Sequence, residues 1–224
     1  MHRKEFSMEI QHKGWNWDQV SSEYWNQISG EFFPIAVDWS RRFHSVLDIG
    51  AGKGRHAFFF ADQGLEVSAI DLSEESIRYI HQEAKNKGVA VNAEVADMTE
   101  LPFADNSFDC VICFHTIYHT DYQGMKRALQ EVNRILKPGG EAYFTFNTKE
   151  NPHYIKEKSV DGYTMIAQEG FEAGIPHCYL DENDLFTLLS DFTIVSMDKI
   201  VNYIRKEHGT HGIHFFVHVK EKGK

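Results

Sequence analysis

Residues 46–55 read VLDIGAGKGR and decide the fold. The apolar run predicts a buried strand over residues 45–50, and the segment after the glycines predicts a helix over residues 55–63. Glycines at such a strand-to-helix turn let the backbone reverse sharply and let a ligand approach the main chain closely. Arg55 stands where the dinucleotide fingerprint requires a third glycine, so the spacing argues against NAD and a dehydrogenase.

Strands and helices alternate on both sides of this turn. Further strands are expected at residues 66–71, 91–96, 108–114, 141–147, 192–199 and 213–219, and further helices at 15–33, 74–87, 124–136 and 182–190. Gly88 is the expected stop of one helix, and residues 137–140 (KPGG) are the stop of another. The pattern predicts an α/β fold with a Rossmann-like, doubly wound, mostly parallel sheet and helices on both faces. The last two strands are expected to form a hairpin.

Composition excludes several classes of protein. The net charge of −10 would repel a polyanion, so DNA and RNA are not expected partners. The sequence contains neither an apolar run of about 20 residues nor an apolar signal core, which favours a cytoplasmic protein without a membrane partner. Cys110 and Cys113 form a C-x-x-C within a predicted strand, where residues three apart point to opposite faces, so both are interpreted as structural.

Acidic residues stand at the ends of the strands that follow the glycine turn. Asp71 ends the second strand, where a carboxylate can accept hydrogen bonds from both ribose hydroxyls of a nucleoside. Leu72 beside it offers an apolar surface for an adenine ring, and Asp97 after the third strand is positioned to accept from the adenine amino group. The sequence therefore predicts a nucleoside site at this edge of the sheet.

Together these motifs identify a family. The glycine turn, the DLS of residues 71–73, the ADMTELPF of 96–103, the NSFD of 106–109 and the LKPGG of 136–140 resemble class I S-adenosylmethionine (SAM)-dependent methyltransferases. The likeness is greatest to the branch similar to quinone-biosynthesis methyltransferases. It implies SAM as cofactor, a small-molecule acceptor, and a seven-stranded sheet with the last strand antiparallel and SAM across the carboxyl ends of the strands.

The resemblance also assigns roles to individual residues. It places the methionine part of SAM near Asp48, Gly50, Gly52, Gly54 and Arg55, with Phe114 and His115 beneath it; it places the ribose at Asp71 and the adenine at Leu72, Asp97 and Met98.

Domain organisation follows from the same pattern. We expect one methyltransferase domain over residues 1–224, with an N-terminal lid helix in 1–44 and a SAM-binding core in 45–147. The irregular segment 148–180 is expected to form a cap, and residues 181–224 the C-terminal helix and hairpin. The number of subunits stays open.

Methyl transfer requires alignment more than a particular catalytic side chain. A base is needed when the acceptor must lose a proton, and His119, in the loop after the fourth strand, is the first candidate for this role or for acceptor contact. His177 and Tyr179, which alternate as strand neighbours would, are further candidates; packing is the alternative role for all three.

The sequence allows two other interpretations. His208, His211, His214 and His218 suggest a metal site, but no cysteine or carboxylate cluster accompanies them, so no metal is expected. The rival to an enzyme is a catalytically silent SAM-binding sensor or partner subunit. Intact SAM positions favour the enzyme.

Overall fold

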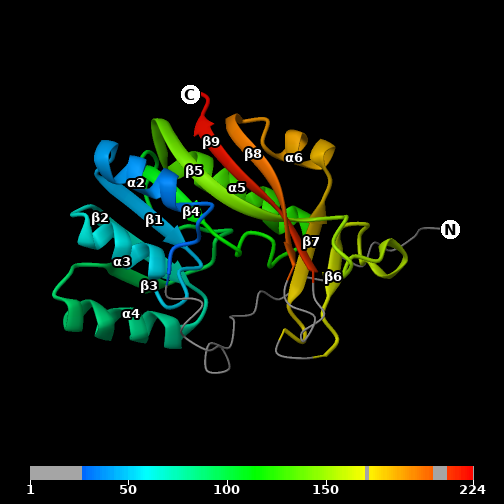
Figure 1. Ribbon diagram of the computed structural model, residues 1–224, viewed down its shortest axis with the longest axis horizontal. Helices are drawn as coiled ribbons and strands as arrows, with labels where there is room; N and C mark the ends of the chain where they lie inside the picture. Colours follow the sequence, from blue (N-terminus) through cyan, green and yellow to red (C-terminus); the bar gives the residue numbers. More distant parts are fainter. Residues whose placement is uncertain (1–26, 170–171, 204–210, 224) are drawn as a thin grey trace.

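A computed structural model describes residues 27–169, 172–203 and 211–223 (Figure 1). The centre of its sheet is β1 (Ser45–Ile49), which pairs in parallel with β2 (Glu66–Asp71) and β4 (Phe108–Cys113). β3 (Asn92–Val95) extends the sheet beyond β2, and β5 (Leu136–Thr148) extends it beyond β4, both in parallel. The predicted alternation of strands and helices is confirmed over this half of the chain.

The other edge of the sheet comes from the end of the chain. β9 (His211–Glu221) pairs antiparallel with β5, and β8 (Phe192–Tyr203) pairs antiparallel with β9. The strand order β3-β2-β1-β4-β5-β9-β8 is therefore the predicted seven-stranded sheet, with its last strand antiparallel. The expected hairpin of the last two strands is also confirmed.

Two further strands bring the described sheet to nine. β7 (Pro176–Leu180) pairs in parallel with the last two residues of β5, and β6 (Thr164–Ile166) pairs antiparallel with β7. The prediction of an irregular segment is wrong for these residues, although the expected alternation of His177 and Tyr179 along a strand is correct. Since β6 and β7 are short, and β7 joins the sheet through β5, which is distant in the chain, local pattern gave little signal for them.

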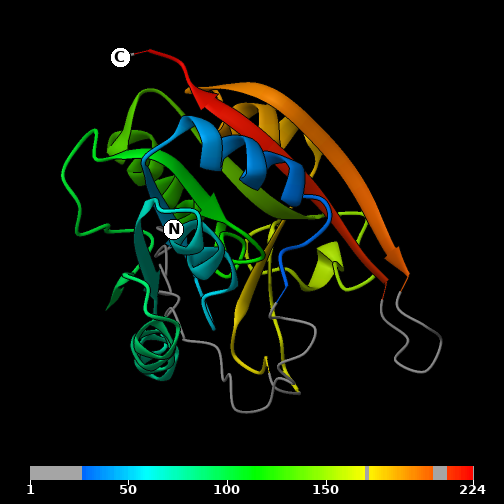
Figure 2. The ribbon, with the colours of Figure 1, turned by 60° about the vertical axis from the view of Figure 1, so that its left-hand side comes forward.

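Helices cover both faces of the sheet, as predicted (Figures 1 and 2). The first face carries α2 (Phe33–Arg42), α3 (Arg55–Asp62) and α4 (Glu74–Lys87), and the second carries α5 (Tyr122–Ile135) and α6 (Glu182–Leu188). A single 3-10 turn, η2, spans Lys156–Lys158. No helix within the described ranges is long and apolar enough to cross a membrane.

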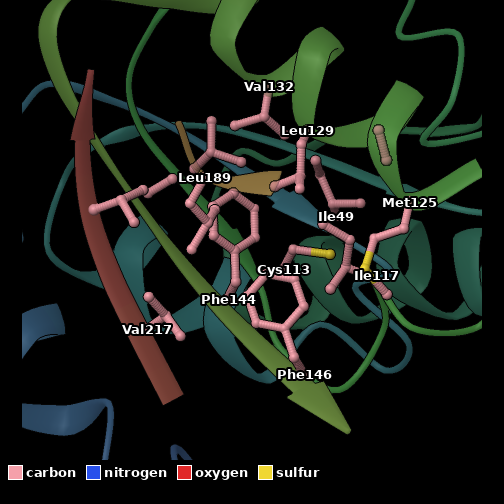
Figure 3. Close-up of a cluster of buried hydrophobic side chains, with 14 of the residues drawn as sticks. Ile49, Cys113, Ile117, Met125, Leu129, Val132, Phe144, Phe146, Leu189 and Val217 are labelled. Atoms are coloured by element: carbon pink, nitrogen blue, oxygen red, sulfur yellow. The ribbon is translucent and has the colours of Figure 1, made fainter. Parts of the chain in front are cut away.

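Two separate cores follow from the alternation of side chains along each strand. Cys110 and Ile112 pack beneath α2–α4, whereas Val111 and Cys113 pack beneath α5 and α6. Figure 3 shows this second core, in which Cys113 lies among apolar side chains that include Phe144 from β5. The two cysteines thus lie on opposite faces, as predicted, and burial raises the pKa of both thiols.

Helix boundaries agree with the predicted stop signals. Gly88 caps the end of α4 in the left-handed region at φ +69°, and α5 ends at Ile135 just before the KPGG segment. α5 begins two residues earlier than expected, because the Asp121 side chain accepts from the backbone N–H of Gly124 and caps the helix at 2.6 Å.

The predicted N-terminal helix at 15–33 is wrong where it can be compared. Residues 15–26 lie outside the described residues, while residues 27–32 are not helical and α2 begins only at Phe33. Pro34 lies in the first turn of α2, a position that suits its fixed φ and missing N–H. Trp39 of this helix is buried, and its Nε1–H donates to Glu141 at 2.7 Å. Figure 2 shows α2 against β5 and β9.

Candidate functional site

The glycine turn is attached to the end of β2. The backbone N–H groups of Gly50 and Ala51 both donate to the carbonyl oxygen of Ile70, at 2.8 and 3.0 Å. Gly50 has φ +68°, and a Cβ added there would collide with the side chain of Thr116 from the loop after β4. Glycine is required at this position by both conformation and space. The turn ends at Gly54, the N-cap residue of α3.

Asp48 lies beneath the turn and is 1% exposed. Its Oδ2 accepts from the backbone N–H of Ala57 in the first turn of α3 at 3.2 Å. Burial raises the pKa of Asp48 to about 7, although the nearby positive charge of Arg55 opposes the increase. The side chain thus holds the start of α3 against β1, and a cation above the turn would favour its charged form.

Asp71 carries the clearest link between the turn and the next strand. Its Oδ2 accepts from the backbone N–H of Gly52 at 2.9 Å, and its Oδ1 accepts from the N–H of Ser73 at 2.8 Å. A carboxylate has about four acceptor positions, so two remain for a ligand. Burial raises the pKa of Asp71 above its ordinary value. Leu72 beside it is exposed, with 38% of its surface accessible.

Asp97 and Met98 follow β3 at the same edge of the sheet. The backbone N–H of Ala96 donates to the carbonyl oxygen of Asp71 at 3.3 Å, which brings the two acidic positions together. Oδ1 of Asp97 accepts from the backbone N–H and the hydroxyl of Thr99, at 2.8 and 2.7 Å. Met98 is partly buried and packs against the α5–α6 core.

Arg55 and Phe114 meet across the start of α3. The Arg55 guanidinium lies 4.9 Å from the centre of the Phe114 ring, a cation–π arrangement, and Nη1 donates to the carbonyl oxygen of Gln27 at 3.4 Å. Phe114 itself is buried at 6% exposure. Arg55 therefore lies at the N-terminal end of a helix, where the positive end of the helix dipole and its own charge both favour an anion.

Four histidines gather beyond the end of β4. The ring of His115 lies 4.7 Å from that of His214 on β9, and the ring of His119 lies 4.9 Å from that of His177 on β7. The Tyr118 hydroxyl joins the group with a 3.2 Å hydrogen bond to Nδ1 of His115. Burial lowers the pKa of His115 and His119 well below 6.5 and that of His214 to about 4. These three imidazoles are therefore neutral at pH 7.

The hairpin β6–β7 brings His177 into this group. The backbone N–H of Cys178 donates to the carbonyl oxygen of Tyr118 at 2.8 Å, which fixes β7 beside the loop after β4. Tyr179 is buried and packs on Tyr154 with ring centres 5.5 Å apart, and burial raises its pKa to about 12. The ring of His177 therefore contacts that of His119, whereas the ring of Tyr179 contacts Tyr154 in the loop after β5.

The sequence did not predict every residue of this histidine cluster. Glu172 lies beside His177, with Oε1 3.5 Å from Nε2, and its position before β7 gave no signal because that strand was not predicted. His214 was considered only together with His218. The structure separates these two, because His218 Nε2 bonds to Glu141 at 2.9 Å while His214 contacts His115. The side chains of His208 and His211 lie outside the described residues.

Known proteins show the same core. The family model described as a methyltransferase domain matches residues 46–140. The Bacillus subtilis uncharacterized methyltransferase YcgJ is 36% identical over 98 residues, which are 43% of this chain and 38% of that protein. The ubiquinone/menaquinone biosynthesis C-methyltransferase UbiE of Cupriavidus taiwanensis is 32% identical over 114 residues, 50% of this chain and 46% of UbiE. The matched segment thus spans less than half the length of these curated relatives.

Solved structures extend the likeness to most of the chain. The PH0226 protein of Pyrococcus horikoshii superposes with a TM-score of 0.71 at 26% identity, covering 90% of this chain and 92% of its own. A SAM-dependent methyltransferase of Methanosarcina mazei gives 0.72 at 22% identity, covering 88% of this chain and 100% of its own. Together the domain match over residues 46–140 and the superpositions support a class I SAM-dependent methyltransferase fold.

Proposed function

We propose that the protein binds SAM across the carboxyl ends of β1 to β4 and transfers the methyl group to a small-molecule acceptor. The observation that carries this proposal is the hydrogen bond from Gly52 to Asp71, which joins the glycine turn to a carboxylate that keeps acceptor positions for a ribose. Asp97 lies beside it for the adenine amino group. A turn that served only to connect a strand to a helix would not require these acidic positions.

In this proposal, the residues at the carboxyl ends of β1 to β4 contact successive parts of SAM. The glycines of the turn and Arg55 would bind the methionine carboxylate, and the buried carboxyl of Asp48 would lie near the positive charges of bound SAM; the position of Arg55 at the start of α3 and the burial of Asp48 support these roles. Leu72 offers an exposed apolar surface for the adenine, beside Met98 and Asp97. Phe114 and His115 lie at the end of β4, where the methionine part would rest.

When bound, SAM supplies an electrophilic methyl group. The protein's own contribution is to hold the acceptor in line with the carbon–sulfur bond and to exclude water. We propose that the acceptor lies against His119 and His177, with Tyr179 behind them. This region is rich in buried rings and neutral imidazoles, which suits a small, partly apolar acceptor. The name of the relative UbiE refers to quinone biosynthesis, and a quinone precursor is an acceptor of this class.

The division of the chain is part of the same proposal. Residues 45–147 would hold SAM, and residues 148–180 would cover the acceptor with the β6–β7 hairpin. The lid expected in residues 1–44 lies mostly outside the described residues. The hydrogen bond between Cys178 and Tyr118 supports the second assignment, because it places the hairpin over the loop after β4. Hydrogen exchange in residues 150–180 should slow when S-adenosylhomocysteine is added. Equal exchange with and without it would contradict a cover.

One experiment tests the proposed function. The protein is first titrated with SAM by calorimetry, and NAD is used as the comparison ligand. It is then incubated with SAM and a metabolite library, and the demethylated product is measured by mass spectrometry. Binding of SAM together with acceptor-dependent turnover is expected. Binding without turnover of any acceptor would favour the silent SAM-binding protein, and failure to bind SAM would reject the proposal.

A further inference from the structure

Three side chains near the acceptor region converge from three segments of the chain. His119 comes from the loop after β4, His177 from β7, and Glu172 from the turn before β7. Each offers one nitrogen or oxygen atom, and these atoms all lie within 4.8 Å of one another. Two imidazoles and one carboxylate form a common set of protein ligands for a catalytic zinc ion or a non-haem iron ion.

The hydrogen bonding of His177 orients it as a ligand. Its Nδ1 lies 3.1 Å from the carbonyl oxygen of Ile175, and because a carbonyl can only accept, Nδ1 carries the hydrogen. Nε2, the other ring nitrogen, faces Oε1 of Glu172, 3.5 Å away. Metal-binding histidines in proteins are held in the same way, with the second nitrogen donating to a carbonyl or carboxylate.

The spacing also fits a single ion. Two atoms bound to one tetrahedral zinc ion at about 2.0–2.1 Å lie roughly 3.3 Å apart. The His177–Glu172 pair, at 3.5 Å, is already close to this separation, and His119 would need a shift of no more than about 1.5 Å.

We propose that His119, Glu172 and His177 bind one divalent transition-metal ion. The ion would connect the β6–β7 hairpin to the loop after β4, which the hydrogen bond between Cys178 and Tyr118 already brings together. Three protein ligands leave at least one coordination position open. The sequence alone predicts no metal, because its candidate ligands, His208, His211, His214 and His218, are a different set of histidines.

The open coordination position of the ion indicates which class of acceptor would be methylated. This inference rests on the proposed function. An acceptor with a hydroxyl or thiol would coordinate the ion through its oxygen or sulfur. Coordination lowers the pKa of such a group, so the O–H or S–H bond breaks and the proton leaves to solvent. The lone pair on oxygen or sulfur then forms the bond to the methyl carbon as the carbon–sulfonium bond breaks and the sulfonium sulfur keeps its electron pair. His119 would then be a metal ligand and not the predicted general base. The metal ion would promote the loss of the acceptor's proton in place of that base.

The metal site is tested on the full chain without any acceptor. The protein is freed of metal with a chelator and titrated with Zn²⁺ by calorimetry, and bound zinc is counted by mass spectrometry. A parallel titration with Co²⁺ follows the visible absorption bands of the bound ion. One equivalent of Zn²⁺ should bind. Glu172→Gln and His177→Ala should each weaken this binding by at least roughly tenfold, since even changes in groups that only orient ligands have effects of that size.

Two exposed histidines provide matched controls. His81→Ala on α4 and His153→Ala after β5 should bind Zn²⁺ like the parent protein, since both side chains are exposed and apart from the cluster. Glu172→Gln keeps the shape of the side chain, so it separates loss of a ligand from loss of folding. Equal affinity in the parent and all variants, or no stoichiometric binding, would overturn the proposal.

Failure of this proposal is distinguishable from failure of the proposed function. SAM titration of the metal-free protein measures cofactor binding alone, because none of the three ligands is among the residues assigned to SAM. A protein that binds SAM and methylates an acceptor but shows no stoichiometric binding of Zn²⁺ would refute the metal site only. A protein that binds one Zn²⁺ but no SAM would refute the proposed function only.

Discussion

The backbone N–H of Gly52 donates to Oδ2 of Asp71 at 2.9 Å, although 19 residues separate the two in the chain. This bond holds the glycine turn against the end of β2 and leaves part of the carboxylate available to a ligand. It joins the two sequence features that first indicated a nucleoside site. Its removal should therefore affect cofactor binding more than the overall fold.

Asp71→Ala should weaken SAM binding by about 1.5–3 kcal/mol, the range for hydrogen bonds that involve a charged group. The fold should persist, but the N–H groups of Gly52 and Ser73 lose their acceptor. Asp71→Asn keeps one carbonyl oxygen and should have an intermediate effect. Calorimetric titration with SAM measures the affinity, and circular dichroism checks the fold.

Asp191→Ala is the control for Asp71, since it removes a carboxyl group from an exposed position. It should bind SAM like the parent protein. An unchanged dissociation constant in Asp71→Ala would remove Asp71 from the site.

Gly50→Ala should destabilise the protein more than Gly64→Ala. Both glycines have positive φ, +68° and +83°, and an alanine at either position pays roughly 1–2 kcal/mol for the left-handed conformation. Only at Gly50 would the new Cβ also meet Thr116, whereas Gly64 has open space around it. Urea unfolding of both variants measures the difference. Equal losses of stability would show that Thr116 moves aside freely.

Asp48→Asn should change the pH dependence of stability. Burial raises the folded pKa of Asp48 to about 7 from an ordinary value of 3.8, so between about pH 4 and 7 the folded state holds a proton that the unfolded state has released. Stability from this group is present at low pH and is lost as pH rises through this window, at up to about 1.4 kcal/mol per pH unit. An asparagine does not titrate, so the loss should disappear.

His56 next to Asp48 has the opposite effect. Burial lowers its pKa well below 6.5, so its contribution is lost as pH falls below about 6.5. The parent protein and the Asp48→Asn variant both contain His56. The difference between their free energies of unfolding in urea at each pH therefore isolates the contribution of Asp48. If that difference does not vary between pH 4 and 7, Asp48 does not hold the proton.

His119→Ala should lower turnover at saturating SAM by about a hundredfold, the scale expected when a group that assists proton removal from the acceptor is lost. SAM affinity should change little, because the imidazole lies on the acceptor side with His177. Steady-state kinetics and SAM titration separate the two effects, and His81→Ala is the matched control. Weaker SAM binding with an unchanged maximal rate would assign His119 to packing near the cofactor.

Local sequence predicted the cofactor half of the protein closely. Alternating apolar runs located β1, β2 and β4, and the glycine turn with Asp71 indicated their ligand edge. The prediction holds because consecutive parallel strands must end at the same edge, so chain order there implies proximity in space. The alternation of side chains along a strand likewise predicted that Cys110 and Cys113 lie on opposite faces.

The N-terminal segment and the hairpin were predicted less well. The helix expected at 15–33 included residues 27–32, which are not helical, and Pro34 lies in the first turn of α2, which begins only at Phe33. β6 and β7 are only 3 and 5 residues long, and β7 is stabilised by pairing with β5 and by the bond to Tyr118. Neither contact is encoded by neighbouring residues.

By itself, the sequence determined the class of fold, the glycine turn and the acidic positions at the ends of β2 and β3, because these depend on short-range periodicity and on the geometry of parallel strands. Only the tertiary structure decided which histidines meet. His119, His177 and His214 lie on three segments that are distant in the chain, and Glu172 joins them through a hairpin whose pairing with β5 is long-range. Residue type and spacing cannot select among 13 histidines, whereas packing at the sheet edge brings together those that share a site.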